Sequence, residues 1–162
     1  GYLKLYHPKN GQHHVRAIST VPVPGDYLYF AFANKNNTAR THPTEITLET
    51  APTVTNYSPS DGQASVAVDA NITLTFSEAV VVYMGNVTIK KTSDNSVFEA
   101  IDVTSDQVTG AGSNTITIDP SSNFASGTDY YVEINQNAFD DTAGVSYVGI
   151  SDATTLNFTT AN

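Results

Sequence analysis

The stretch Asn71-Ile72-Thr73-Leu74-Thr75-Phe76 decides the fold of this chain. Its apolar residues occupy every even position, which is the period of a β-strand with one buried face and one solvated face. The same alternation recurs at 114–118, 130–134 and 155–159, and shorter alternating pieces lie at 86–91 and 97–103. These patterns predict an all-β protein.

Short turn sequences separate the predicted strands at regular intervals. Clusters of Gly, Pro, Ser, Asn and Asp lie at 59–62, 93–96, 110–113, 119–122 and 126–128. No stretch of ten residues keeps the apolar period of a helix, although 137–140 could form one helical turn. About seven short strands in roughly 110 residues indicate a two-sheet Greek-key β-sandwich.

The inward-facing positions of these strands form the predicted core. Gly127 permits a tight corner that delivers the following strand, with Tyr131 and Glu133 on the opposite face. Ser77-Glu78 is expected to end its strand and enter a loop. Each larger core residue contributes about 1.5–3 kcal/mol on full burial. The expected core residues are Phe76, Tyr130, Val132, Ile134 and Phe158.

Composition narrows the class of protein. Charged residues make up 14% of the 162 residues, against about a quarter in typical globular chains, so Ser, Thr, Asn and Gln supply most of the surface. That balance is typical of extracellular β-proteins. The absence of Cys excludes disulfides, thiolate metal sites and cysteine nucleophiles. The net charge of −9 argues against nucleic acid or an anionic membrane as partner.

No segment for membrane insertion or secretion is visible in the sequence. No apolar run approaches the roughly 20 residues that span a bilayer, and the start Gly1-Tyr2-Leu3-Lys4 lacks a signal-peptide pattern. We therefore expect a mature or excised part of a longer protein that is secreted or lies at the cell surface. Its first partners would be neighbouring domains of the same polypeptide.

The charge changes sign near residue 50. Residues 1–50 carry five basic and three acidic residues, a net charge of +2, and all four histidines. Residues 51–162 carry two lysines against thirteen acidic residues, a net charge of −11. Between them Glu49-Thr50-Ala51-Pro52 indicates an extended connector, because the residue before a proline is pushed away from helical geometry. We predict two domains, 1–50 and 51–162.

The order of motifs in residues 51–162 is more specific than strand counting. Ser58-Pro59-Ser60-Asp61-Gly62 precedes Leu74-Thr75-Phe76-Ser77-Glu78, and Phe139-Asp140-Asp141-Thr142-Ala143-Gly144 precedes Leu156-Asn157-Phe158-Thr159. This segment resembles the bacterial Ig-like domain of surface-layer proteins, adhesins and secreted polysaccharide-degrading enzymes. Val145 and Leu156 depart from the family pattern, which often has Asn and Trp there. The resemblance implies an Ig-like sandwich with a structural or spacer role.

Residues 1–50 predict a small β segment. Strands are expected at 2–6, 13–19 and 26–33, with a fourth at 46–50. The stretch from Gly25 to Asn34, followed by 43–50, is weakly similar to the last hairpin of a fibronectin-type-III sandwich, and Pro24-Gly25-Asp26-Tyr27 to the C-terminal sandwich of galactose-oxidase-like enzymes. Fifty residues supply only half of such a sandwich, so we expect either that the missing strands lie upstream in the natural protein or that this segment packs on the acidic domain as an extension of it.

The histidines are the first candidate site. His7, His13, His14 and His42 could bind zinc or copper, but neighbouring strand residues point to opposite faces, so only one of His13 and His14 can join a given ion. They are interpreted mainly as surface residues. No metalloprotease, serine-hydrolase or nucleotide-binding motif is present, and we predict no catalytic residues and no enzyme.

Calcium is the second candidate, because carboxylate oxygens are its preferred ligands and the acidic segment has few cations. Asp140 and Asp141 lie in one loop, and Asp152 could return nearby; Asp61 and Asp69 flank another loop. No calcium-loop motif of the EF-hand kind is present. A bound calcium at Asp140, Asp141 and Asp152 is a hypothesis beside the plainer one of solvated surface acids.

Carbohydrate is the third candidate ligand, because aromatic rings serve as platforms for sugars. Tyr57 and Tyr147 are the preferred platform residues. The full set of tyrosines expected to be exposed is Tyr6, Tyr27, Tyr29, Tyr57, Tyr83 and Tyr147.

Three functions follow from these observations. The preferred one is a non-catalytic extracellular Ig-like structural or adhesive module of a larger bacterial surface or secreted protein. The second is a carbohydrate-binding accessory module of a secreted polysaccharide-active enzyme, with a polysaccharide or cell-surface glycan as partner. The third is the C-terminal fragment of a metal-dependent extracellular enzyme.

Overall fold

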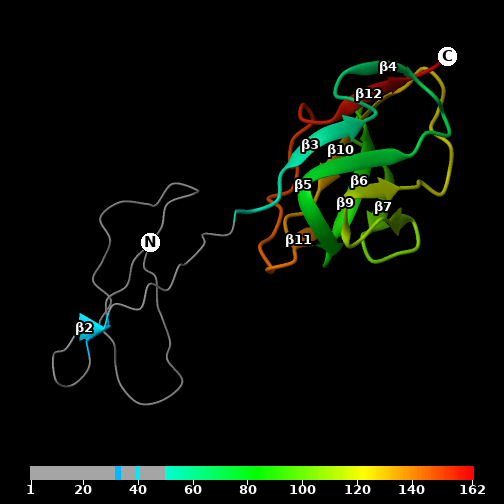
Figure 1. The fold of residues 1–162 in the computed structure, drawn as a ribbon. Coiled ribbons are helices and arrows are strands. Elements are labelled where there is room, and N and C mark those ends of the chain that lie inside the picture. The colour runs from blue at the N-terminus through cyan, green and yellow to red at the C-terminus, as the bar shows by residue number, and fades with distance from the viewer. Residues whose placement is uncertain (1–31, 34–38, 41–49) are drawn as a thin grey trace. The chain divides into compact units, whose positions relative to one another are not determined.

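The computed structural model describes residues 32–33, 39–40 and 50–162 (Figure 1). The chain divides into two units, Gly1–Glu49 and Thr50–Asn162. In the first, β1 (Phe32–Ala33) pairs antiparallel with β2 (Ala39–Arg40). The predictions of strands at 2–6, 13–19 and 46–50, and of half a second sandwich, lie outside the described residues.

The second unit is an all-β sandwich of two sheets, as predicted (Figure 1). One sheet has the order β4 (Gln63–Val66), β12 (Asn157–Thr160), β10 (Asp129–Ile134), β6 (Asn86–Lys91) and β7 (Val97–Asp102). The other has the order β11 (Phe139–Asp141), β5 (Ile72–Val82), β9 (Ser113–Ile118) and β8 (Val108–Thr109), and β3 (Val54–Ser58) also pairs with β5. Sheet neighbours such as β5 and β9, or β6 and β10, are separated in sequence by strands of the other sheet.

The predicted core is confirmed. Phe76, Tyr130, Val132, Ile134 and Phe158 are all at most 2% exposed, and Leu156 is fully buried. The aromatic residues of the core form two groups. Tyr130 and Phe158 contact Phe124, with ring centroids 4.9 and 5.2 Å away. Phe76 lies 5.4 Å from both Phe139 and Tyr147.

Two local predictions are wrong. The strand of Phe76 does not end at Ser77-Glu78, because β5 continues to Val82 after a register shift between Thr75 and Val80. Its second half is held by β11, which pairs with Val80, Val81 and Val82.

Residues 137–140 form no helical turn, since Asn137 has a φ of 68° and β11 begins at Phe139. The segment from 50 to 162 has ten strands rather than about seven.

The sandwich has two distinct ends. The C-terminal end contains the loop 124–128, the segment 61–70 and the last residues of the chain, where Gly127 takes a φ of 56° at the predicted tight corner. The β11 end contains residues 81–85 and 135–151, at the opposite end of the strands (Figure 1). Within the described part of the chain, no helix has the length and apolar character to cross a membrane.

Candidate functional site

Asp141 is the most deeply buried acidic residue described. Its side chain is 3% exposed at the end of β11. Its Oδ1 accepts hydrogen bonds from the backbone N–H groups of Ala143 (2.8 Å) and Val145 (2.7 Å), so the carboxylate holds the tight turn that follows. Its Oδ2 is buried without a hydrogen-bond partner, and so is Oδ1 of the preceding Asp140. A buried polar atom without a partner is rare in folded proteins.

Asp152 has a different environment. It is exposed, and its carboxylate accepts four hydrogen bonds of 2.8 Å from the backbone and hydroxyl groups of Thr154 and Thr155. These hydrogen bonds favour the charged form and lower the pKa of Asp152 from 3.8 to about 2. Asp152 therefore holds its own loop.

The other predicted acidic pair is also divided. Oδ1 of Asp61 accepts hydrogen bonds from the backbone N–H (3.1 Å) and the side-chain amide (2.7 Å) of Asn157, 96 residues away. Asp69 is exposed. Asp61 therefore connects the start of β4 to the start of β12 rather than forming a site with Asp69.

The structure does not bring Asp140, Asp141 and Asp152 together as one ligand set. Among residues 50–162 no three His, Cys, Asp or Glu side chains form a group that could hold a metal ion. His7, His13, His14 and His42 lie outside the described residues. Calcium binding stays a prediction. If calcium binds the folded domain, the melting temperature should be higher in excess Ca²⁺ than in EDTA, because a ligand of the native state stabilises it by mass action. Equal melting temperatures would contradict calcium binding.

The two preferred tyrosines lie close together, but one is not on the surface. Tyr147 is 4% exposed, so the expectation that it is exposed is wrong. Its ring packs edge-on against Phe76, which covers it from the long β5 strand. Burial, with a smaller effect of the neighbouring Tyr57 phenol, raises the pKa of Tyr147. Tyr57 is half-buried against the core.

The exposed tyrosine is Tyr83, at 53% exposure. Met84 and Val148 are also exposed at the β11 end, at 51% and 71%. Tyr6, Tyr27 and Tyr29 lie outside the described residues.

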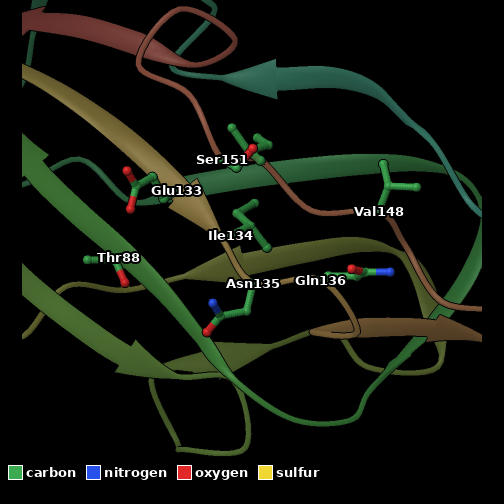
Figure 2. Close-up of a pocket in the computed structure, with 8 residues that line it drawn as sticks. Thr88, Glu133, Ile134, Asn135, Gln136, Val148 and Ser151 are labelled. Atoms are coloured by element: carbon green, nitrogen blue, oxygen red, sulfur yellow. The ribbon is translucent and has the colours of Figure 1, made fainter.

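A groove of about 310 Å³ lies on the outer face of the β10 sheet. Figure 2 shows Thr88 and Glu133 on adjacent strands, with Val148 and Ser151 on the loop beside them. Polar groups dominate the lining, which comprises Thr88, Glu133, Ile134, Asn135, Gln136, Val148, Ile150 and Ser151.

Charge pairing fixes one wall of this groove. Lys90 Nζ donates to Oε2 of Glu133 at 2.7 Å, and it lies 5.9 Å from the ring centroid of Tyr131. The hydrogen bond to Glu133 raises the pKa of Lys90. The ion pair therefore positions the Glu133 side chain beside the amides of Asn135 and Gln136, a set of groups that can donate to and accept from hydroxyl groups.

No local sequence pattern indicates this groove. Its lining comes from β6, the end of β10 and the loop 148–151, which are far apart in the chain. The isolated bridge between Ile134 and Ile150 places the loop against β10. Because none of these residues belongs to a local motif, only the sheet pairing brings them together.

The second unit is similar to known proteins of one family. The family model described as "Bacterial Ig-like domain" matches residues 48–160. CopC from Methylosinus trichosporium OB3b is a similar solved structure, at 17% identity and a TM-score of 0.48, with 68% of this chain and 93% of that chain covered. The S-layer protein rSbsC(31-844) is similar at 17% identity and a TM-score of 0.45, with 69% of this chain and 14% of that chain covered. Among curated proteins none matches.

Proposed function

The chain belongs to the bacterial Ig-like domain family, and from this premise we propose that it is a non-catalytic extracellular structural or adhesive module of a larger bacterial surface or secreted protein. The observation that carries the proposal is the use of its acidic side chains. Asp61, Asp141 and Asp152 each accept hydrogen bonds that hold a turn or join two strands. Side chains that could carry chemistry therefore stabilise the fold instead.

The surface composition supports an extracellular position. The described sandwich contains only two cations, Lys90 and Lys91, against thirteen acidic residues, and most of its remaining polar surface is uncharged. Such a surface stays soluble through net charge and favours neither nucleic acid nor anionic lipid. A spacer between other domains needs these properties.

Because the chain has no cysteine, a single introduced thiol can test whether the protein lies outside the cell. In cells that produce the full-length protein, Asp106→Cys places one thiol at an exposed position, and Val132→Cys places one in the core. A membrane-impermeant maleimide should label Asp106→Cys on intact cells or in the medium. Labelling of Asp106→Cys only after lysis would contradict the proposal, and labelling of Val132→Cys would reveal unfolded protein.

A second candidate function is glycan binding at the outer groove. The specific observation is the lining, in which Glu133, Gln136 and Ser151 offer a carboxylate, an amide and a hydroxyl beside the exposed Val148. Such groups recognise the hydroxyls of neutral sugars. This proposal replaces the Tyr147 platform, because that ring is covered, and transfers recognition to polar side chains.

Affinity electrophoresis in neutral and acidic polysaccharides tests glycan binding. Gln136→Ala and Ser151→Ala should each weaken retardation by about two- to tenfold, the value of one hydrogen bond. Thr159→Ala on β12 of the same sheet is the matched control and should bind like the parent. Absence of retardation in every polysaccharide, or an equal loss in the control, would contradict the groove as the site.

A further inference from the structure

The first and last strands of one sheet meet as parallel neighbours. β4 lies beside β12, with Gln63 opposite Phe158 and Val66 opposite Thr160 (Figure 1). Backbone hydrogen bonds close both ends of the pair: the N–H of Gly62 donates to Asn157 O at 2.8 Å, and the N–H of Ala161 donates to Val66 O at 2.7 Å. The pair therefore joins the first and last strands of this sheet, while β3, which precedes β4 in the chain, pairs with β5 of the other sheet.

A side-chain bracket reinforces the start of this pair. The carboxylate of Asp61, directly before β4, accepts from both the backbone N–H and the side-chain amide of Asn157, the first residue of β12. Two of the hydrogen bonds that join the strands thus depend on one carboxylate. Asp61 is exposed, so its removal leaves no buried group without a partner on its own side.

The last strand is also tied along its other edge. β10 pairs with it antiparallel, so β12 lies between two strands rather than at the sheet edge. Thr160 is buried; its hydroxyl donates to Ala125 O at 2.6 Å and accepts from the N–H of Thr128 at 2.9 Å. Ala161 O accepts from the N–H of Gly127 at 2.9 Å.

The direction of the strands decides how this arrangement responds to tension. β4 runs parallel to β12, so tension between residues 60 and 162 pulls the two strands in opposite directions along their own axes. Tension applied at residue 50 first loads β3, which pairs with β5, and reaches β4 once β3 is released. The hydrogen bonds between β4 and β12 lie across the direction of the pull and share the load. In a hairpin pulled at its open end, by contrast, the bonds break one at a time.

We propose that the β4–β12 pair with the Asp61–Asn157 bracket is a mechanical clamp, through which the module bears tension between the domains on either side of it. The inference deepens the proposed structural role and rests on it. Unfolding under force follows the unfolding rate rather than equilibrium stability alone, so a clamp between the first and last strands of this sheet can resist tension beyond what the core predicts.

Single-molecule force spectroscopy on the full chain tests the clamp. Because the chain has no cysteine, paired substitutions define the points of attachment. Ser60→Cys with Asn162→Cys, both at exposed positions, loads the clamp directly because Ser60 lies between β3 and β4. Met84→Cys with Asp106→Cys, both at exposed positions, pulls the β6–β7 hairpin apart at its open end. With at least four hydrogen bonds loaded together, the first geometry should unfold about 100-fold more slowly at equal force.

Variants pulled in the first geometry test the contribution of Asp61 to the clamp. Asp61→Ala should unfold about tenfold faster at equal force, since two hydrogen bonds are lost, and Asp61→Asn, which keeps an acceptor, should restore the lifetime. Asp102→Ala is the matched control, because the Asp102 carboxylate also accepts two hydrogen bonds, both from Thr104 in its own turn. It should lower equilibrium stability without shortening the lifetime under force.

Equal lifetimes in the two pulling geometries, or an equal effect of Asp61→Ala and Asp102→Ala, would overturn the clamp. Either result is independent of the maleimide test of surface exposure. A module that labels on intact cells yet unfolds at equal rates in both geometries would be a surface spacer without a clamp.

Discussion

At the C-terminal end of the sandwich, the buried hydroxyl of Thr160 donates to one backbone group and accepts from another. At the β11 end, buried oxygens of Asp140 and Asp141 have no partner, and Tyr83, Met84 and Val148 expose apolar surface. The two ends of the same sheets therefore differ in whether their buried polar groups have hydrogen-bond partners. The comparison teaches that buried polar groups are satisfied at the C-terminal end, whereas the β11 end combines unpartnered buried oxygens with exposed apolar side chains.

The largest expected difference concerns the aromatic groups. Phe158→Ala should destabilise the domain by about 3–5 kcal/mol, because it removes a ring that packs on Phe124 and Tyr130 beneath β12. Phe139→Ala at the β11 end should cost less, since a less constrained loop can collapse into the cavity. Urea denaturation measures both values, and a greater loss for Phe139→Ala would break the comparison.

The next effect concerns the Thr160 hydroxyl. Thr160→Val keeps the shape of the buried side chain but leaves the partly buried N–H of Thr128 without its acceptor, which should cost about 1–3 kcal/mol. Thr159→Val is the matched control on the adjacent residue, whose hydroxyl donates to Asp129 at an exposed site. Its cost should stay below about 1 kcal/mol. Equal losses would show that burial of the hydrogen bond does not matter here.

Asp141 gives the corresponding test at the β11 end. Asp141→Ala removes the acceptor of two backbone N–H groups and should cost about 1–3 kcal/mol. Asp141→Asn keeps the Oδ1 acceptor but places an amide NH2 group where the unpartnered Oδ2 lay, so in urea denaturation it should cost less than Asp141→Ala, about 1 kcal/mol. Equal losses for Asp141→Asn and Asp141→Ala would contradict the assignment of the stability to the Oδ1 hydrogen bonds.

The smallest effect depends on pH. Hydrogen bonds from Thr154 and Thr155 lower the pKa of Asp152 from 3.8 to about 2, so its contribution to stability is fully present above pH 3.8 and is lost as pH falls through about 2. The stability difference between the parent and Asp152→Ala should therefore shrink over that interval. A difference that is constant down to pH 2 would contradict the assignment of these hydrogen bonds to the charged form.

Alternation along single strands was enough to predict the sandwich. The inward positions of Phe76 and of β10 needed only the period of two, which local sequence displays. The short strands β4, β8 and β11 have at most four residues, too few to show a period. The continuation of β5 past Glu78 depends on its pairing with β11, some sixty residues later, which no local pattern encodes.

The candidate sites were harder to predict for the same reason. Tyr147 was expected at the surface, but Phe76 of a distant strand covers it. Tyr131 lies on the outer face as predicted, yet it is 4% exposed there, with its hydroxyl donating to Asn95 and Lys90 near its ring. Residue type indicated which side chains could carry chemistry, whereas their availability was decided by partners far apart in the chain.

Native-state hydrogen exchange tests the contrast between the two ends most directly. The amides of Thr128 and Ala161 at the C-terminal end, and those of Ala143 and Val145 at the β11 end, all donate hydrogen bonds. The first pair should exchange only through global unfolding, with protection equal to the full free energy of unfolding, and the second through local opening at lower free energy. Equal protection at both ends, or stronger protection of Ala143 and Val145, would contradict the account.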